Sequence, residues 1–407
     1  MAGDLQSKAV REENPMASDA IIFIPGIKGT KLVESNRANW DTIWSGIQSN
    51  FESIQDLELA RTGAGSYFDE RIDSIIQPVD IEELAYAEFL ADLDTKKPVY
   101  IFNYDWRLSA QVNGERLHEF LNLLVAKSEA SAGVETFSRF DVITHSLGNF
   151  IFRNYVHNHG FDRIHKAVLT VPPFLGSLDI VSAALLGEGW FPNVKSKFRK
   201  LVRTMPGALE LLADYPGASR LEPNESHSFF NFDQWQSNVN RIRRNDPIPQ
   251  KLKDALADAK VTVNSRLADL GDLPEEQRDR ILIIVRDGYE TMQSLSVRPR
   301  HTGVANFVDF ETAHRTTDGD GRVPHVSSCT YADRITTLIL RDAFWYREYN
   351  HGFVLKDERV QKLVGRFLFS RRRFSYSIPG GSIERVVGLT RYFHSDTGLP
   401  AWSVETD

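Results

Sequence analysis

The sequence contains a serine, an aspartate and a histidine whose order and surroundings suit nucleophilic catalysis: Ser146, Asp320 and His351. A serine hydroxyl is a weak nucleophile at neutral pH and needs an adjacent base, which a histidine oriented by a carboxylate supplies. Ser146 stands in "THSLGN", where a short apolar run ends and apolar residues resume at helical spacing. A sharp bend between strand and helix would expose its hydroxyl. This set of residues predicts acyl transfer through an acyl-enzyme.

Each of these residues, taken alone, also fits a role without catalysis. Ser146 fits a turn that needs small side chains, and Thr144 departs from the G-x-S-x-G pattern of nucleophile turns. Asp318 and Asp320, in "TTDGDGRVP", fit a solvated turn, and His351 fits a surface histidine. The three types occur in the order Ser, Asp, His, each after its own predicted strand. Because this is the order of an α/β-hydrolase triad, we favour the triad.

The elements that must position these residues alternate between short apolar strands and helices. Strands are predicted at 20–24, 98–104, 140–144, 166–172, 280–285 and 335–341, and a helix at about 113–131. Continuous apolar strands separated by helices predict an α/β fold with a mostly parallel sheet flanked by helices. Ligands meet such a sheet at the carboxyl ends of its strands, where the three residues occur.

A glycine turn after the first strand supplies a candidate oxyanion hole. In "FIPGIKGTKL", residues 23–32, backbone N–H groups can point at the acyl oxygen. Ile27 is assigned by its position, together with the amide of Leu147.

The interval from about 175 to 279 interrupts the alternation and has no convincing strand. We interpret it as a helical cap inserted in an α/β-hydrolase domain of residues 19–370. Residues 1–18 form a polar segment, and residues 371–407 form an extension to which the sequence assigns no role.

The bulk composition excludes several classes. The 407 residues carry a net charge of −7, which argues against nucleic acid as a partner. The only cysteine is Cys329, so no intramolecular disulfide can form, and we expect a buried structural thiol. The N-terminus has no secretory signal, and no run approaches the ~20 apolar residues of a transmembrane helix. We therefore expect a cytoplasmic protein.

Several motifs in collinear order, over about residues 20–369, give a family resemblance. They are "PGIKGTKL", "YDWRLS", "THSLGN", "PPFLGS", "MPGALELLADYP", "DGDGRVP" and "HGFVLKDERV". Together they resemble the lecithin:cholesterol acyltransferase family of α/β-hydrolases. The resemblance implies Ser146 as nucleophile, His351 as base and Asp320 as the orienting acid, since the family's acid stands three residues before the valine of "DGRVP". It also implies an oxyanion hole from the backbone of Ile27 and Leu147.

The chain departs from the family in two ways. Vertebrate members carry a signal peptide and a lid pinned by a disulfide, and this chain has neither. Thr144 replaces the glycine usual before "HSLG". The resemblance therefore implies acyl-ester chemistry more strongly than any particular lipid or acceptor.

Other residues near these motifs have expected roles in packing or in substrate contact. His145 is expected to pack or orient, and Asp105 and Arg107 to form a structural ion pair. The candidate substrate contacts are Trp106, Trp190 and Phe191. In "WFPNVKSKFRKLVR" the mixed basic and apolar residues favour a cap helix with a solvated face over contact with an anionic membrane surface, although the cap stays a candidate for peripheral membrane contact.

The sequence thus predicts a serine-dependent hydrolase or O-acyltransferase that acts on lipid-like esters. A dedicated O-acyltransferase with an alcohol acceptor and a catalytically silent binding module are the alternatives. This chemistry requires no metal or organic cofactor. An EF-hand calcium loop is excluded, because the twelfth position counted from Asp318 is Cys329. No protein partner is inferred.

Overall fold

The computed structural model describes residues 20–34, 41–44, 57–59, 75–131, 136–187, 195–221, 227–235, 248–265, 270–298, 307–341, 350–369, 376–378, 381–383 and 392–393.

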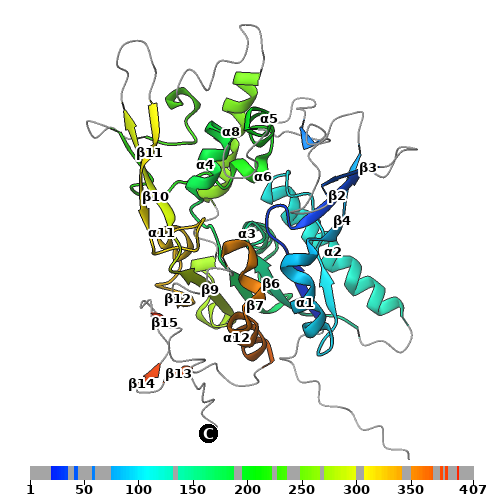
Figure 1. Ribbon diagram of the computed structural model, residues 1–407. Coiled ribbons are helices and arrows are strands. Elements are labelled where there is room, and N and C mark those ends of the chain that lie inside the picture. Colours follow the sequence, from blue (N-terminus) through cyan, green and yellow to red (C-terminus); the bar gives the residue numbers. More distant parts are fainter. Residues whose placement is uncertain are drawn as a thin grey trace, which may run out of the picture.

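A seven-stranded sheet forms the centre of the protein (Figure 1), and every pairing in it is parallel. The order across the sheet is β15–β12–β9–β7–β6–β1–β5. Its strands are β1 (Ala20–Ile24), β5 (Val99–Ile101), β6 (Phe140–His145), β7 (Ile164–Thr170), β9 (Ile281–Asp287), β12 (Thr336–Arg341) and β15 (Tyr392–Phe393). The predicted α/β fold with a mostly parallel sheet is confirmed.

Helices cover both faces of this sheet, and the alternation of side chains along the strands explains why. Ile21 and Phe23 of β1 pack in one core cluster with helices α1 (Glu83–Asp94) and α12 (Glu358–Phe369). Ile22 and Ile24 pack in the other with α2 (Ala110–Ala130) and α3 (Gly148–His159). Because successive residues of a strand point to opposite faces, a strand buried on both sides must be apolar throughout, as "AIIFI" is.

The interval predicted as a helical cap is mainly helical. It contains α4 (Leu178–Leu185), α5 (Lys195–Val202), α6 (Pro206–Leu209), a 3-10 turn η2 (Phe232–Gln234), α8 (Ile248–Ser265) and α10 (Glu275–Arg278). Helices α4, α5, α6 and α8 gather at the top of Figure 1. The expectation of no strand was wrong for β8 (Ser219–Leu221), which is too short to show a pattern of its own.

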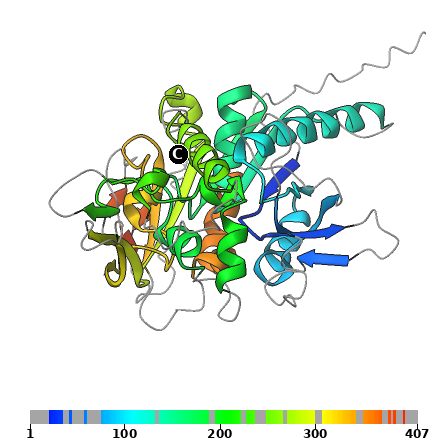
Figure 2. The same cartoon turned by 90° about the horizontal axis from the view of Figure 1, so that it is seen from above.

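Two small sheets flank the cap helices, and the sequence analysis anticipated neither. In one, β8 pairs with β10 (Thr291–Arg298), and β10 pairs with β11 (Phe307–Thr316). In the other, β2 (Thr30–Glu34) lies between β3 (Asp41–Trp44) and β4 (Ile76–Ile81). Figure 2 shows the blue strands on one side and the yellow strands on the opposite side, with the green cap helices between them.

The remaining short elements are α11 (His325–Ser328), η4 (His351–Lys356), β13 (Tyr376–Ile378) and β14 (Gly381–Ile383). Residues 1–18 and most of 371–407 lie outside the described residues, so the proposed domain boundaries stay predictions. Among the helices that the structure describes, none is long and apolar enough to cross a lipid bilayer.

Candidate active site

Ser146 occupies a tight turn between β6 and α3. Its φ of 51° lies in the left-handed region, which L-residues other than glycine seldom adopt. The following helix starts against the end of β1: a Cβ on Gly148 would lie 2.4 Å from the carbonyl oxygen of Ile24. Only glycine fits that approach. The strand, turn and helix here have the arrangement of a nucleophile elbow.

Thr144, the departure from the usual small residue, is accommodated by hydrogen bonds. Its hydroxyl donates to Asn149 Oδ1 at 2.6 Å, and the Asn149 amide nitrogen donates to the carbonyls of Ser146 and Thr170 at 2.8 and 3.1 Å. Thr144 and Asn149 are both fully buried. The threonine therefore helps to fix the turn that carries Ser146.

The structure brings Ser146, His351 and Asp320 into one hydrogen-bonded chain. His351 Nε2 lies 2.8 Å from Ser146 Oγ, and His351 Nδ1 lies 2.7 Å from Asp320 Oδ2. A carboxylate accepts, so Nδ1 carries the proton and Nε2 accepts from the serine hydroxyl. All three residues are buried, whereas Asp318 is exposed.

The Asp320 carboxylate is held in its ionised form. Its Oδ1 accepts from the backbone N–H groups of Arg322 and Val323 at 2.9 and 2.7 Å. Burial alone would raise the pKa of Asp320, but the nearby His351 and these hydrogen bonds lower it below the ordinary value. An ionised carboxylate can both orient His351 and stabilise its protonated form.

The backbone groups assigned to the oxyanion hole lie on turns that meet at the serine. A Cβ on Gly26 would lie 3.0 Å from Ser146 Cβ, so the turn containing Ile27 touches the nucleophile turn directly. Within the part of the chain that the structure describes, the N–H groups of Ile27 and Leu147 donate to no acceptor. Both remain available for a developing negative charge.

His145 links three elements around the site. Its Nε2 lies 2.8 Å from the carbonyl oxygen of His351 and its Nδ1 lies 2.7 Å from the hydroxyl of Tyr86. Because a carbonyl can only accept, Nε2 carries the proton and the Tyr86 hydroxyl donates to Nδ1. Burial lowers the pKa of His145 to about 3, so the ring is neutral. With both nitrogens engaged, His145 suits orientation rather than proton transfer to substrate.

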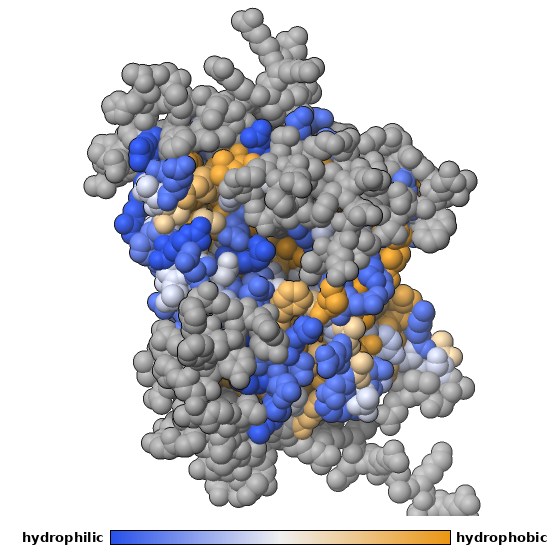
Figure 3. Space-filling model, viewed as in Figure 1, coloured by the Kyte–Doolittle hydropathy of each residue, from blue (hydrophilic) through white to orange (hydrophobic). Residues whose placement is uncertain are grey.

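A cavity of about 310 Å³ opens beside Ser146 and His351. Its apolar walls come from the turn (Ile27), α1 (Ala85) and the cap interval (Ile180 and Leu211). The face drawn in Figure 3 is hollowed near its centre, where orange apolar surface shows between blue polar residues. A cavity of this size and lining suits an apolar chain.

Of the aromatic substrate contacts predicted from the sequence, only Trp106 lies in the part of the chain that the structure describes. Trp106 is 1% exposed, donates from Nε1 to the carbonyl of Thr30 at 3.0 Å, and does not line the cavity. The ring of Trp44 packs edge-on against it, with the ring centroids 5.9 Å apart, and Trp44 lines the cavity instead. Trp190 and Phe191 lie outside the described residues.

The ion pair expected beside Trp106 is present. Arg107 Nη2 and Nε donate to the Asp105 carboxylate at 2.6 and 2.9 Å, and both residues are buried. Sequence reasoning missed Tyr86 and Lys28, which also line the cavity. Burial and the charge of Arg322 lower the pKa of Lys28 well below its ordinary value. Tyr86 lies in none of the motifs quoted above, and Lys28 stands in "PGIKGTKL" without a role of its own there.

The fold is that of an α/β-hydrolase, and comparison with known proteins finds a similarity to one family over part of the chain. Residues 93–255 match the family model described as lecithin:cholesterol acyltransferase. The predicted resemblance is confirmed over this range, which includes Ser146. The predicted enzyme class, an ester hydrolase or acyltransferase, is confirmed with it.

One solved structure with a TM-score above 0.5 supports the fold, and two others are reported for comparison only. A chain of the Tle4–Tli4 complex aligns with a TM-score of 0.59 at 15% identity, over 86% of this chain and 98% of that one. Lipase BlEst2 of Bacillus licheniformis aligns with a TM-score of 0.37 at 9% identity, over 86% and 92%. Phospholipase PlaB of Legionella pneumophila gives 0.34 at 11% identity, over 88% and 60%. No curated protein sequence matches the chain.

Proposed function

We propose that the protein cleaves lipid-like esters through an acyl-enzyme on Ser146. The observation that carries this proposal is the chain of hydrogen bonds from Ser146 through His351 to Asp320. Ser146 Oγ attacks the acyl carbonyl while His351 Nε2 takes its proton. The amides of Ile27 and Leu147 stabilise the oxyanion.

Collapse of the tetrahedral intermediate releases the alcohol, which takes the proton from His351. Water or a second alcohol then loses a proton to His351 and attacks the acyl-enzyme, and Ser146 is regenerated. Asp320 holds the imidazole in the tautomer that both steps need. The acyl chain occupies the cavity between Ile27, Ile180 and Leu211.

Labelling with a fluorophosphonate probe and turnover of esters of increasing chain length test this proposal. Ser146→Ala should lose the label, and its kcat should fall by roughly 10⁴ to 10⁶-fold. The exposed Ser131→Ala is the matched control and should keep both label and turnover. Label that persists on the Ser146→Ala protein would reject Ser146 as nucleophile.

A second pair of variants tests the acid. Asp320→Asn should impair turnover far more than Asp318→Asn, because only the Asp320 carboxylate reaches His351 Nδ1. The reverse result would move the acid to Asp318.

Transfer to an alcohol acceptor is the second candidate function, and burial of the site favours it. Ser146 and His351 are 4% and 7% exposed, and cap residues line the same cavity, which limits the access of water. Offering an alcohol acceptor alongside water and measuring the partition of the acyl group separates the two. A predominantly transferred product assigns an O-acyltransferase, and free acid alone assigns a hydrolase.

A further inference from the structure

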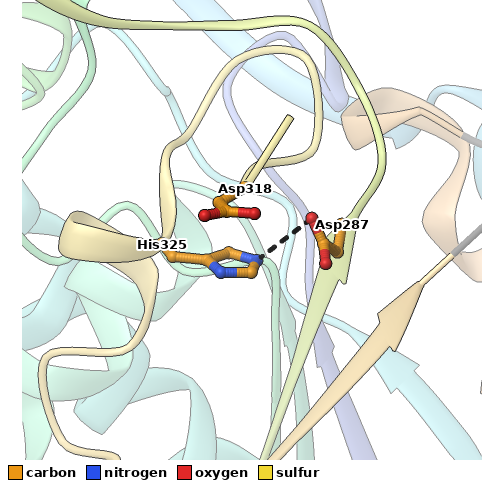
Figure 4. Close-up of side chains that lie close together, drawn as sticks. All are labelled: Asp287, Asp318 and His325. Atoms are coloured by element: carbon orange, nitrogen blue, oxygen red, sulfur yellow. Dashed lines mark ion pairs between the residues drawn. The ribbon is translucent and has the colours of Figure 1, made fainter. Parts of the chain in front are cut away.

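Three side chains with metal-binding atoms face one another outside the cavity (Figure 4): Asp287, Asp318 and His325. Asp287 ends β9, Asp318 follows β11, and His325 is the first residue of α11. Each residue offers one ligand atom, and the three atoms lie within 4.8 Å of one another. None of the three residues lines the cavity beside Ser146.

His325 Nε2 makes one long hydrogen bond and stands farther from the Asp287 carboxylate. The nitrogen lies 3.8 Å from Asp287 Oδ1 and 3.3 Å from the carbonyl oxygen of Arg286. Good N–H···O hydrogen bonds measure about 2.7 to 3.2 Å between heavy atoms. Two ligands that each lie ~2.0 to 2.2 Å from one cation are roughly 3 to 3.6 Å apart. The 3.8 Å between His325 Nε2 and Asp287 Oδ1 is a few tenths of an ångström wider than this, so the side chains would draw slightly closer around an ion.

The charges of the cluster favour a cation. Asp287 is fully buried and Asp318 brings a second carboxylate toward it. Buried carboxylates need compensation by an opposite charge or by coordination. Asp287 Oδ1 accepts from the N–H of Gly288 at 2.7 Å, and His325 lies on its other side. A divalent ion between Asp287 and Asp318 would offset their mutual repulsion.

The geometry points to a binding site for a divalent transition-metal ion held by Asp287, Asp318 and His325. An imidazole with two carboxylates suits Zn²⁺ or Mn²⁺, whereas Ca²⁺ prefers oxygen ligands alone. Asp318 is exposed and His325 half-buried, so an ion can enter from solvent and keep water on its open positions. The ion would take no part in acyl transfer.

An ion bound at this site would stabilise the position of the turn that carries Asp320. Asp318 precedes Asp320 by two residues, and the backbone already joins this turn to the segment after β9. Gly288 N–H donates to the carbonyl of Thr317 at 2.8 Å, and Tyr289 N–H donates to that of Gly319 at 3.1 Å. An ion bridging Asp287 to Asp318 would reinforce the same junction with a stronger link.

Metal titration of the untagged full-length protein, stripped with a chelator and dialysed, tests the site. Zn²⁺ binding by calorimetry and Mn²⁺ binding by electron paramagnetic resonance should each give one site per chain. Asp318→Asn and His325→Gln should weaken binding at least ~10-fold. The control His314→Gln, an exposed histidine on β11, should bind like the wild type. Asp318 is exposed, so its variant should fold even if Asp287→Asn does not.

Thermal unfolding gives an independent readout. Zn²⁺ at about 100 times its Kd should raise the Tm of the wild type and of His314→Gln by about 3 °C. Asp318→Asn and His325→Gln should show less than half that rise. A wild-type protein that binds neither ion, or variants that bind both as tightly as the wild type, would overturn the proposal.

Discussion

The buried, neutral state of His145 predicts a specific dependence of stability on pH. Burial lowers the pKa of His145 from 6.5 to about 3 in the folded protein, while the unfolded chain has the ordinary value. Between about pH 3 and pH 6.5, His145 is therefore protonated in the unfolded chain and neutral in the folded protein. This contribution to stability is complete above pH 6.5 and is lost as the pH falls toward 3.

The magnitude follows from the two pKa values. Between pH 7.5 and pH 5.0 the unfolded chain gains most of one proton at this position and the folded chain gains almost none. The free energy of unfolding should therefore fall by about 2 kcal/mol on account of His145 alone. His145→Gln keeps a donor and an acceptor but does not titrate. Its free energy of unfolding should therefore fall by about 2 kcal/mol less than that of the wild type over the same pH range.

Urea unfolding of both proteins at pH 7.5 and pH 5.0 checks the prediction. The variant should be less stable at pH 7.5, because the amide cannot reproduce both the contact with Tyr86 and that with the carbonyl of His351. The gap should then narrow by about 2 kcal/mol at pH 5.0. Other groups titrate equally in both proteins and cancel. If the free energy of unfolding fell equally in the two proteins between pH 7.5 and pH 5.0, His145 would not be a buried neutral ring.

Two further predictions concern Gly148 and Cys329. Gly148→Ala should lower the free energy of unfolding by about 3 kcal/mol or more, because its Cβ would lie 2.4 Å from the Ile24 carbonyl oxygen. Gly365→Ala, on α12, is the matched control, because a Cβ there would have no atom within 4 Å. This variant should be as stable as the wild type or more stable in urea unfolding. Equal stability of the two variants would contradict the predicted clash between the new Cβ at position 148 and the Ile24 carbonyl. Burial raises the pKa of Cys329 to about 12, so at pH 8 iodoacetamide should alkylate it at least ~100-fold more slowly in the folded protein than in urea. Comparable rates, followed by mass spectrometry, would show that the thiol is not shielded.

The parts of the fold that the sequence predicts are those with a strong local signal. β1 has the bounds expected from "AIIFI", and β6 and β9 fall where continuous apolar runs predict buried strands. Ser146 and His351 follow strands of the central parallel sheet, β6 and β12, and the carboxyl ends of parallel strands meet at one edge, so their proximity could be predicted from chain order. Asp320 instead follows β11, a strand of the small sheet with β8 and β10, so its position beside His351 could not be derived in the same way.

The parts that the sequence did not predict depend on contacts between distant segments. β8 has three residues and exists only through its pairing with β10, 70 or so positions further on. Trp106 was a plausible contact by proximity in sequence, yet Trp44 stands between it and the cavity. Tyr86 and Asp287 lie in no local motif, and although Asp318 opens "DGDGRVP", nothing local shows that it faces Asp287 and His325.

The sheet formed by β8, β10 and β11 joins the cap interval to the turn that carries Asp320. β8 belongs to the cap interval, and β11 leads directly into the turn that carries Asp320. The cap is therefore not an interchangeable module. Cap segments could be exchanged between related enzymes to alter the acyl chain that they accept. Such an exchange would have to include residues 291–316, because without them the turn that carries Asp320 would lose the strand pairing that holds it.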